Sequence, residues 1–399
     1  MPLALAAVPG SGSRAFTLTV DGMARSGVVA PVLLASALDP VESVWVVRNR
    51  LTRKFTEELA ALVAKTEGAP TVRYVEHSDS SSDIWMQDTV EFAVSSYPEG
   101  STGSRQIITP LTGLRSKHDM GLNCAPLDAR VREMVTRELP AAVPVDVGEP
   151  LPGRRWIDWY GNLEVSPPVR GFPLGRILTG EQKGLRIHPD LITFLEQQTV
   201  QGPPLFLDVS WLTIGHVDEL INFVPAPDRK GFRALLPSPA LALRLLEEAI
   251  RTGHGDSRIF SGRKSEISAQ NLRSKIGLSE ETATITAALA RTRTTLHDEL
   301  GLEDADIVEL PALFQDGLAV LPNPVNSLVL GKTVLIPAPE GPKINGADLF
   351  QKAIRERLEP LGLRLHFMDI WEPYHTRSGE IHCGTNTVRR LRNPQWWDR

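Results

Sequence analysis

The stretch Arg377-Ser-Gly-Glu-Ile-His-Cys-Gly-Thr-Asn386, close to the C-terminus, carries the strongest chemical signal in this sequence. The 399 residues include only two cysteines, so a disulfide framework does not explain Cys383. Gly384 follows it directly, and because glycine has no side chain, backbone or substrate can approach the sulfur closely. This pattern is typical of a presented nucleophile, and it predicts that a base and carboxylates come from elsewhere in the chain.

Composition and charge exclude several classes of protein. Hydrophobic residues make up 42% of the chain and charged residues 23%, which are ordinary globular values. The length allows one large domain or two to three smaller ones. The formal net charge of -5 and the sequence pI of about 6.0 argue against a nucleic-acid partner, which usually requires a basic surface.

The sequence also argues against a membrane partner, because no stretch reaches the roughly 18 apolar residues that a membrane span needs. The apolar start, Met1–Ala7, lacks a basic region and is too short for a signal peptide. We therefore expect a soluble cytoplasmic protein, with secretion through a leader left open.

Strand-like runs alternate with amphipathic helical patterns, and this alternation predicts an α/β protein. The strand-like runs are Phe16–Val20, Val41–Val47, Val90–Val94, Pro204–Val209, Leu220–Val224, Ser327–Ile336 and Arg364–Ile370. The helical patterns are Arg53–Lys65, Ala129–Leu139, Leu241–Arg251, Gln270–Leu302, which we expect to be broken, and Ala347–Leu358. No clear sequence repeat is visible, but the alternation is compatible with repeated modules that have diverged.

A histidine and an aspartate stand two residues apart in Trp211-Leu-Thr-Ile-Gly-His-Val-Asp-Glu219. On extended backbone, His216 and Asp218 would point to the same face, beside each other. A surface histidine near a solvated acid is the better explanation of an isolated motif this short, although the adjacent glycine and tryptophan favour a shaped site. His382 is the alternative base. On extended backbone it would point away from Cys383, so we expect a structural or supporting role for it.

Two further segments offer oxygen ligands. In Asp83-Ile-Trp-Met-Gln-Asp-Thr-Val-Glu91, an extended backbone would place Gln87 and Glu91 on one face and Asp88 on the other. Asp88 could then serve the nucleophile's pocket, while the other two, with carbonyls from another loop, would form an all-oxygen site of the kind that Ca²⁺ prefers. The segment Trp159-Tyr-Gly-Asn-Leu-Glu-Val-Ser-Pro-Pro168 could supply such carbonyls and a carboxylate. Each segment alone is explained more simply as a turn.

One substrate explains these residues together. A guanidinium is planar, permanently cationic and carries five hydrogen-bond donors in a fixed fork. Asp88 and Asp218 would clamp it through charge-assisted hydrogen bonds, and Cys383 would attack its central carbon. His216 would give a proton to the leaving ammonia, and Trp85 could pack against the methylene stem of an arginine.

Four motifs in this order resemble the catalytic domain of protein-arginine deiminases. They are Trp85-Met-Gln-Asp88, Gly161-Asn-Leu-Glu-Val-Ser-Pro-Pro168, Trp211-Leu-Thr-Ile-Gly-His-Val-Asp-Glu219 and Gly379-Glu-Ile-His-Cys-Gly-Thr-Asn386. Pro322-Asn-Pro-Val-Asn326, Ile344-Asn-Gly346 and Gln395-Trp-Trp397 fit the same family. The similarity runs from about Val41 to the C-terminus.

The resemblance implies a five-bladed α/β propeller, the pentein fold, over residues 41–399, after an N-terminal extension over residues 1–40. Animal members carry two immunoglobulin-like domains before the catalytic one, and 40 residues cannot hold them. The resemblance further implies that Cys383 attacks the arginine Cζ, that His216 protonates departing ammonia and later activates water, and that Asp88 and Asp218 hold the guanidinium. Arginine-containing peptides or proteins would be the partners.

The resemblance also assigns substrate and metal residues. Trp85 and Ile214 match positions that line the arginine stem, Arg377 matches an arginine near the pocket mouth, and Arg115 lies near the family's substrate-backbone arginine. The family is calcium-dependent. The positions that match its Ca²⁺ site nearest to catalysis are Gln87, Glu91, Tyr160, Leu163 and Glu164.

Two alternatives stay open. One is a small-molecule member of the same fold, such as an agmatine deiminase or an arginine or dimethylarginine hydrolase. Those families usually place an Arg-Asp pair where this chain has Gln87-Asp88, so we expect the protein-arginine type. The other alternative is a catalytically silent, calcium-responsive binding module, against which the intact set of catalytic residues argues.

Overall fold

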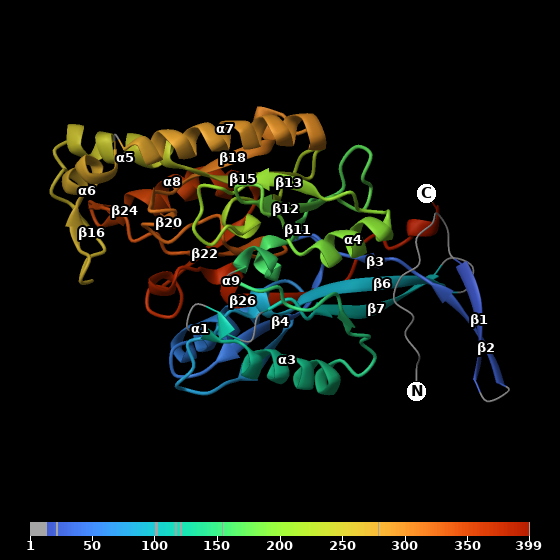
Figure 1. Ribbon diagram of the computed structural model, residues 1–399. Coiled ribbons are helices and arrows are strands. Elements are labelled where there is room, and N and C mark those ends of the chain that lie inside the picture. Colours follow the sequence, from blue (N-terminus) through green and yellow to red (C-terminus); the bar gives the residue numbers. More distant parts are fainter. Residues whose placement is uncertain are drawn as a thin grey trace.

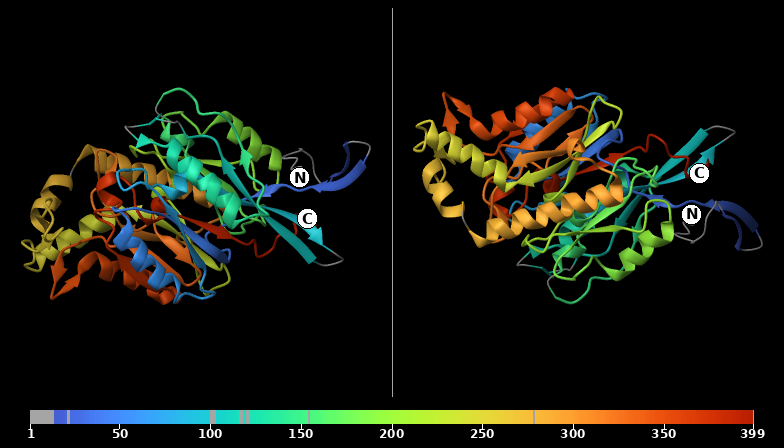
Figure 2. Two further views of the ribbon diagram at one scale, coloured as in Figure 1. Left: turned by 90° about the horizontal axis from the view of Figure 1, so that it is seen from below. Right: turned by 90° about the horizontal axis from the view of Figure 1, so that it is seen from above.

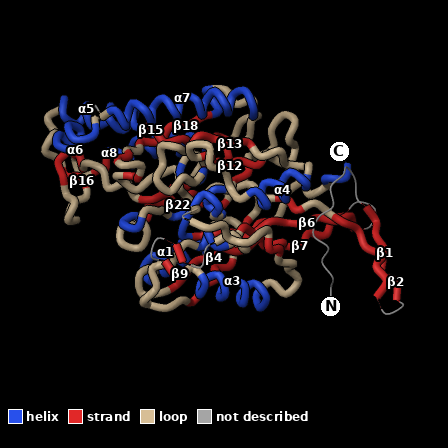
Figure 3. Tube along the Cα trace, viewed as in Figure 1, coloured by secondary structure: helices blue, strands red, loops and turns tan. Residues whose placement is uncertain are grey.

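The computed structural model describes residues 14–20, 23–99, 103–115, 118–119, 122–153, 155–277 and 279–398. Strands and helices alternate along the chain, which confirms the α/β prediction. The strands lie mostly inside, and the long helices α7 (Glu280–Leu300) and α3 (Ala125–Glu138) cover opposite outer edges (Figures 1 and 3).

The described part of the chain builds five sheets of three or four strands on one repeated plan. In each sheet a first strand pairs antiparallel with a second, a helical segment follows, and a third strand runs parallel to the second. The helical crossover is what a parallel pair requires. The structure therefore shows as repeated topology what the sequence does not show as a repeat.

The strands of the five sheets have the following bounds. The sheets are β26 (Thr385–Arg389), β4 (Val41–Arg48) and β5 (Thr71–Glu76); β6 (Glu91–Glu99), β7 (Gly103–Thr112) and β10 (Val145–Asp146), extended by β3 (Val32–Leu33); β11 (Glu164–Val165), β12 (Ile177–Glu181) and β13 (Leu205–Asp208); β14 (Asn222–Pro225), β15 (Phe232–Ser238) and β18 (Ile307–Pro311); and β21 (Leu328–Leu330), β22 (Thr333–Pro337) and β25 (Arg364–Met368).

The predicted helical patterns are confirmed by the crossover helices α1 (Arg53–Val63), α3, α5 (Pro239–Arg251), α6 (Ala269–Ile276), α7 and α8 (Leu349–Leu358). A further crossover helix, α4 (Pro189–Gln198), was not predicted from the sequence. The expected break in the long pattern falls between α6 and α7. Gly277 follows the end of α6, and the Ser279 side chain accepts a hydrogen bond from the Thr282 N–H at the start of α7, as an N-cap does.

One segment that was predicted as a single strand forms two strands in the structure. The run Ser327–Ile336 forms the antiparallel hairpin β21–β22, because Gly331 turns the chain with a φ of +60°. That left-handed conformation is open to glycine and costly for most other residues. The hydrophobic run was long enough for one strand, and only the glycine marks the turn.

The sheet that contains β26 and β4 joins the two ends of the described fold, because β26 lies near the C-terminus and β4 near the start of the core. The short strand β3 extends the neighbouring sheet by pairing with β6. Before it, the hairpin β1 (Arg14–Val20) and β2 (Met23–Val29) projects from the rest of the molecule (Figure 2). None of the described helices is long and apolar enough to cross a membrane.

A short entry segment precedes the first strand of each sheet. These entry segments are α2 (Met86–Thr89) before β6, the 3-10 turn η2 (Tyr160–Asn162) before β11, η3 (Val217–Glu219) before β14, residues 323–326 before β21, and α9 (Ile381–Gly384) before β26. Segments α2 and η2, α2 and α9, and η2 and η3 contact one another. The repeated topology therefore gathers residues that lie up to about 300 positions apart in sequence.

Candidate active site

A cavity of about 60 Å³ lies where the entry segments meet. Its lining combines aromatic walls with acidic, basic and thiol groups, and it consists of Trp85, Asp88, Leu122, Trp156, Trp159, Ile214, His216, Glu219, Arg377, Ser378, Gly379 and Cys383. Few polar groups in an otherwise apolar pocket are typical of a small-molecule or side-chain binding site.

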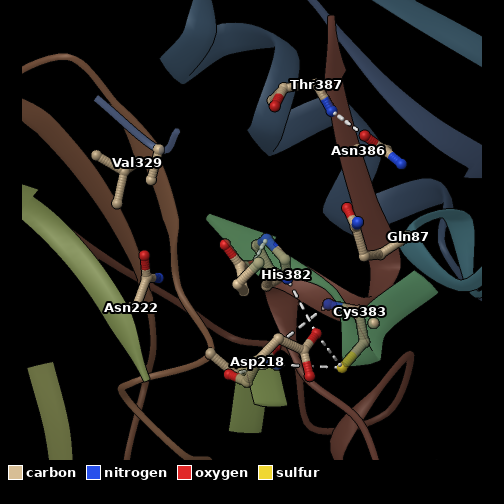
Figure 4. A network of polar contacts seen from close by, with 12 residues as sticks. Gln87, Asp218, Asn222, Val329, His382, Cys383, Asn386 and Thr387 are labelled. Atoms are coloured by element: carbon tan, nitrogen blue, oxygen red, sulfur yellow. Dashed lines mark hydrogen bonds and ion pairs between the residues drawn. The ribbon is translucent and has the colours of Figure 1, made fainter. Parts of the chain in front are cut away.

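The Cys383 thiol is buried at this cavity, with 6% of the residue exposed. Its S–H donates to Asp218 Oδ2 over 3.4 Å (Figure 4). The Asn326 Nδ2 amide donates to Sγ over 3.2 Å. Burial raises the pKa of the thiol well above its usual range, and Asp218 and Asp88 raise it further. The thiolate form therefore needs a cation or hydrogen-bond donors beside it.

The two carboxylate oxygens of Asp218 differ in their hydrogen bonding. Its Oδ2 accepts a 2.9 Å hydrogen bond from His382 Nδ1 in addition to the thiol contact. Its Oδ1 is buried and has no hydrogen-bond partner among the described residues. A buried carboxylate oxygen without a partner costs free energy, unless a ligand supplies the donor. The orphan oxygen is therefore available to a cationic N–H donor from a substrate.

His216 and Asp88 form a second pair at the same cavity. His216 Nδ1 lies 3.5 Å from Asp88 Oδ1, and His216 Nε2 lies 2.7 Å from the Trp156 carbonyl oxygen. Burial raises the pKa of Asp88 to about 6, His216 opposes this shift, and Asp218 adds to it. The Gly161 N–H donates to Asp88 Oδ1 over 3.2 Å.

Gly161 also explains why the pair fits so closely. A Cβ at this position would lie 2.5 Å from His216 Nδ1 and 2.6 Å from Asp88 Oδ1. Real Cβ atoms do not approach so closely, so only glycine leaves room for both side chains. The Gly-Asn turn that looked ordinary in the sequence thus has a specific steric role.

The structure corrects the backbone conformations expected for three motifs. Asp88 lies in the short helix α2, and Asp218 lies in the 3-10 turn η3, where extended backbone was expected. Cys383 and His382 lie in the short helix α9. The expectation of extended backbone was wrong because period-two arguments apply only inside a strand, and these residues precede their strands.

The expected separation of side chains is nevertheless found. Asp88 faces the cavity, and Gln87 faces Glu91 and η2. His382 does not line this cavity, and its side chain is half-buried. It bridges two carboxylates, with Nδ1 2.9 Å from Asp218 Oδ2 and Nε2 3.2 Å from Glu164 Oε1. Burial opposes its charged form, but Glu164 and Asp218 raise its pKa to about 9.

Three of the residues expected to bind substrate, namely Trp85, Ile214 and Arg377, line the cavity. Trp85 packs against Gly379, where a Cβ would lie 2.4 Å from the indole ring. Sequence reasoning missed the roles of Trp156, Trp159 and Glu219. The close spacing of the two tryptophans before the Gly-Asn turn was the available signal.

Arg115 does not line the cavity. Its guanidinium is buried, forms a 2.6 Å ion pair with Asp83, donates to Thr89 and stacks over the Trp159 ring at 4.8 Å. It lies 3.4 Å from Asp128. This geometry favours a supporting role, because the side chain ties the Asp88 segment to α3 and lies against a cavity wall.

Replacing Arg115 with leucine should destabilise the fold by about 3–5 kcal/mol, because the buried Asp83 carboxylate loses its counter-charge. Urea denaturation would measure the change in the free energy of unfolding. The matched control is Arg132→Ala, which removes the more exposed pair with Asp146 and should cost at most about 1 kcal/mol. A folded Arg115→Leu protein of unchanged stability and a higher KM would instead support contact with the substrate.

The five residues expected to bind calcium lie together behind the cavity. Gln87 Nε2 donates to Glu91 Oε2 over 2.9 Å and to the Tyr160 carbonyl oxygen over 3.4 Å. Gln87, Glu91, Leu163 and Glu164 line a second cavity of about 40 Å³. Within the described residues, no group of three or more His, Cys, Asp or Glu side chains is arranged to hold a metal ion.

The donor set nevertheless fits a hard cation, because it is built from two carboxylates, an amide and backbone carbonyls. Burial and, next to it, the Glu164 carboxylate raise the pKa of Glu91 to about 8. Burial raises the pKa of Glu164 to about 6, against the opposing effect of His382. Burial raises the pKa of both acids, so a divalent ion beside them would favour their charged forms.

Comparisons with known proteins agree with this site. The family model described as protein-arginine deiminase (PAD) matches residues 26–398. Human protein-arginine deiminase type-4 is 36% identical over 390 residues, which cover 93% of this chain and 56% of the relative. The type-3 enzyme of Rattus norvegicus is 37% identical over 391 residues, which cover 92% and 55%. The chain thus spans about half the length of these curated relatives.

Solved structures show the fold at much lower identity. Agmatine deiminase of C. jejuni superimposes with a TM-score of 0.50 at 13% identity, covering 90% of this chain and 96% of that one. Agmatine deiminase of Enterococcus faecalis gives a TM-score of 0.50 at 12% identity, with the same coverage. At this identity the likeness concerns the fold alone. The family match over most of the sequence is decisive, and the chain belongs to the protein-arginine deiminase family.

Proposed function

We propose that this protein hydrolyses the guanidinium of peptidyl-arginine to citrulline and ammonia through a covalent intermediate on Cys383. The observation that carries the proposal is the convergence of Cys383, His216 and Asp88 on one cavity, with Asp218 in contact with the Cys383 thiol and one buried oxygen of Asp218 lacking a donor. A guanidinium supplies the missing donors in the fork geometry that two carboxylates accept.

The reaction balances as one guanidinium plus one water giving one ureido group plus one ammonium ion. The Cys383 sulfur attacks Cζ and forms a C–S bond. His216 gives a proton to one terminal nitrogen, and the C–N bond breaks as ammonia leaves, which yields a thiouronium. Water then loses one proton to His216 and attacks Cζ. As the C–S bond breaks, the added hydroxyl loses its remaining proton, which ends on the released ammonia as ammonium, and citrulline and the thiolate are formed.

The carboxylates act by position and charge. Asp88 and Asp218 hold the guanidinium over the sulfur, so that attack becomes an intramolecular step. The bound cation also lowers the free-energy cost of the thiolate, which burial and the same two carboxylates otherwise oppose. The tryptophan walls exclude water from the reacting atoms and pack against the apolar stem.

Calcium would be held by Gln87, Glu91 and Glu164 and by the carbonyls of Tyr160 and Leu163. When bound, it would neutralise the two carboxylates and order α2 and η2, which carry Asp88 and Gly161. Because Gln87 presents its Nε2 to Glu91 and Tyr160, cation binding requires its amide to turn its oxygen inward.

Calcium should raise the thermal midpoint of the protein by a few degrees, because a ligand that binds only the folded state stabilises it. Differential scanning fluorimetry with chelator, Ca²⁺ and Mg²⁺ measures this without any substrate. Glu91→Gln should reduce the shift strongly, and Glu133→Gln, on the exposed face of α3, should not. An equal midpoint with chelator and millimolar Ca²⁺ would contradict the assignment.

The five sheets further support a five-bladed pentein propeller, with the cavity at its centre. We also propose that residues 41–399 form the catalytic domain and residues 1–40 an extension, and that the protein acts in the cytoplasm. The substrate-binding roles of Trp85, Ile214 and Arg377 follow from their positions on the cavity wall.

The substrate class is tested with equal concentrations of a blocked arginine peptide, free arginine and agmatine, with ammonia release as the common readout. Faster turnover of the peptide is expected, because the relatives that match most of this chain are named protein-arginine deiminases. Activity on agmatine alone would support the small-molecule alternative. No ammonia from any substrate, with or without Ca²⁺, would support a binding module.

A further inference from the structure

Asn326 is a buried polar residue to which the chemistry above gives no role. It ends the entry segment before β21, at the place in the repeated plan that Asp88, Asp218 and Cys383 occupy before other sheets. Its exposed fraction is 0%, so its amide must be satisfied inside the protein.

The Asn326 amide is oriented by its contacts. Its Oδ1 accepts the Cys383 backbone N–H over 3.2 Å, and its Nδ2 donates to the Asp218 carbonyl oxygen over 3.2 Å. A backbone N–H can only donate and a carbonyl can only accept, so these two bonds fix which end of the amide is which. The same Nδ2 lies 3.2 Å from Cys383 Sγ and must present a donor to it.

The backbone strengthens this placement. The Asn326 carbonyl oxygen accepts the His382 N–H over 3.3 Å, so both ends of the residue hold the turn that carries the nucleophile. Sγ therefore contacts both an oriented donor, Asn326 Nδ2, and the Asp218 carboxylate, 3.4 Å away.

A negatively charged thiolate at this position is unfavourable, because it is buried and lies near two carboxylates. Burial and the carboxylates of Asp218 and Asp88 raise the pKa of Cys383, while a backbone hydrogen bond from Glu380 lowers it. Among the described side chains, only Asn326 donates a hydrogen bond to Sγ. A donor to an ionised acceptor is stronger than a neutral pair, so its effect increases as the proton leaves.

We propose that Asn326 is a catalytic residue that stabilises the Cys383 thiolate through its Nδ2 donor and keeps Sγ aimed into the cavity. The inference rests on the proposed role of Cys383 as the nucleophile. Asp88, Asp218 and Cys383 come from the entry segments of three sheets. With Asn326, the entry segment of a fourth sheet also contributes to the active site.

Alkylation of Cys383 by iodoacetamide tests this without substrate. The sulfur forms a bond to carbon, the carbon–iodine bond breaks, iodide leaves, and the thiol proton passes to the buffer. Peptide mapping separates Cys383 from the buried Cys124. Measured across pH, the rate follows the thiolate population. Asn326→Ala should slow alkylation about tenfold at neutral pH and move the profile up by about one pH unit, the loss expected for one charge-assisted hydrogen bond.

Asn326→Asp is the second variant. It keeps the size and the Oδ1 acceptor for the Cys383 N–H but replaces the donor with a carboxylate, so the upward shift should be larger than in the alanine variant. Asn323→Ala is the matched control, because Asn323 is a buried asparagine of the same segment that donates to the Glu219 carbonyl oxygen and not to sulfur. It should leave the pH profile at its wild-type position.

An unshifted profile in either folded Asn326 variant overturns the inference, and so does an equal shift in the Asn323 control. Failure of the proposed function is seen separately, as absence of citrulline from the wild-type protein. The alkylation profile would still report whether Asn326 stabilises the thiolate.

Discussion

Cys383→Ser is expected to abolish citrulline formation, with a loss of at least about 10⁴-fold in kcat, because a serine hydroxyl in this pocket cannot replace the thiolate as nucleophile. The protein should remain folded, since the substitution changes one buried atom and leaves the Asn326 bond to the Cys383 backbone in place. Quantifying citrulline in a blocked arginine peptide under saturating substrate and Ca²⁺ measures the loss.

Cys124→Ala is the matched control for this loss. Cys124 is buried and free like Cys383, but it lies at the start of α3 outside the cavity. Removal of its small side chain should lower stability modestly and leave kcat largely intact. Comparable citrulline formation by Cys383→Ser and wild type would contradict the assignment of the nucleophile.

Asp218→Asn should separate two properties that usually change together. Loss of one clamp charge should lower kcat/KM for the arginine peptide by about 10³-fold, because the guanidinium loses a charged partner in a dry site. The same change removes a carboxylate that raises the pKa of Cys383, so the thiolate becomes more populated at neutral pH. Iodoacetamide should therefore react with Cys383 faster than in wild type.

The opposite changes in the two rates, slower substrate turnover and faster alkylation of Cys383, are what make the Asp218→Asn experiment informative. A variant that merely loosened the site would change substrate turnover without favouring the thiolate. Asp208→Asn, on the partly exposed end of β13, serves as the control and should change neither rate. Slower alkylation together with slower turnover would contradict the electrostatic account of Asp218.

The class of fold could be predicted from hydrophobic patterns, and the candidate site residues from their chemistry. Alternating hydrophobic runs indicate strands and helices locally, but the repeated plan of five sheets depends on pairings such as β26 with β4, which join distant segments. Asp88, His216, Asp218 and Cys383 could be proposed together because one substrate, a guanidinium, would use the chemistry of all four. Their local conformations could not be predicted, because short helices and 3-10 turns have too few residues to show a period.

Other features depended on tertiary contacts that no local pattern encodes. Arg115 could be a substrate ligand or a buried ion-pair partner, and only its approach to Asp83 and Trp159 distinguishes the two. The bridge of His382 between Asp218 and Glu164 and the contact of Asn326 with Sγ arise because separate entry segments meet. Neither could be derived from spacing along the chain.

The most direct test of the central claim is the conversion of a blocked arginine peptide to its citrulline form by the purified protein with Ca²⁺, followed by mass spectrometry beside an ammonia assay. We predict one ammonia for each citrulline with the wild-type protein, and neither product with Cys383→Ser. Citrulline formation that persists in Cys383→Ser, or a wild-type protein that releases no ammonia from the peptide, would contradict it.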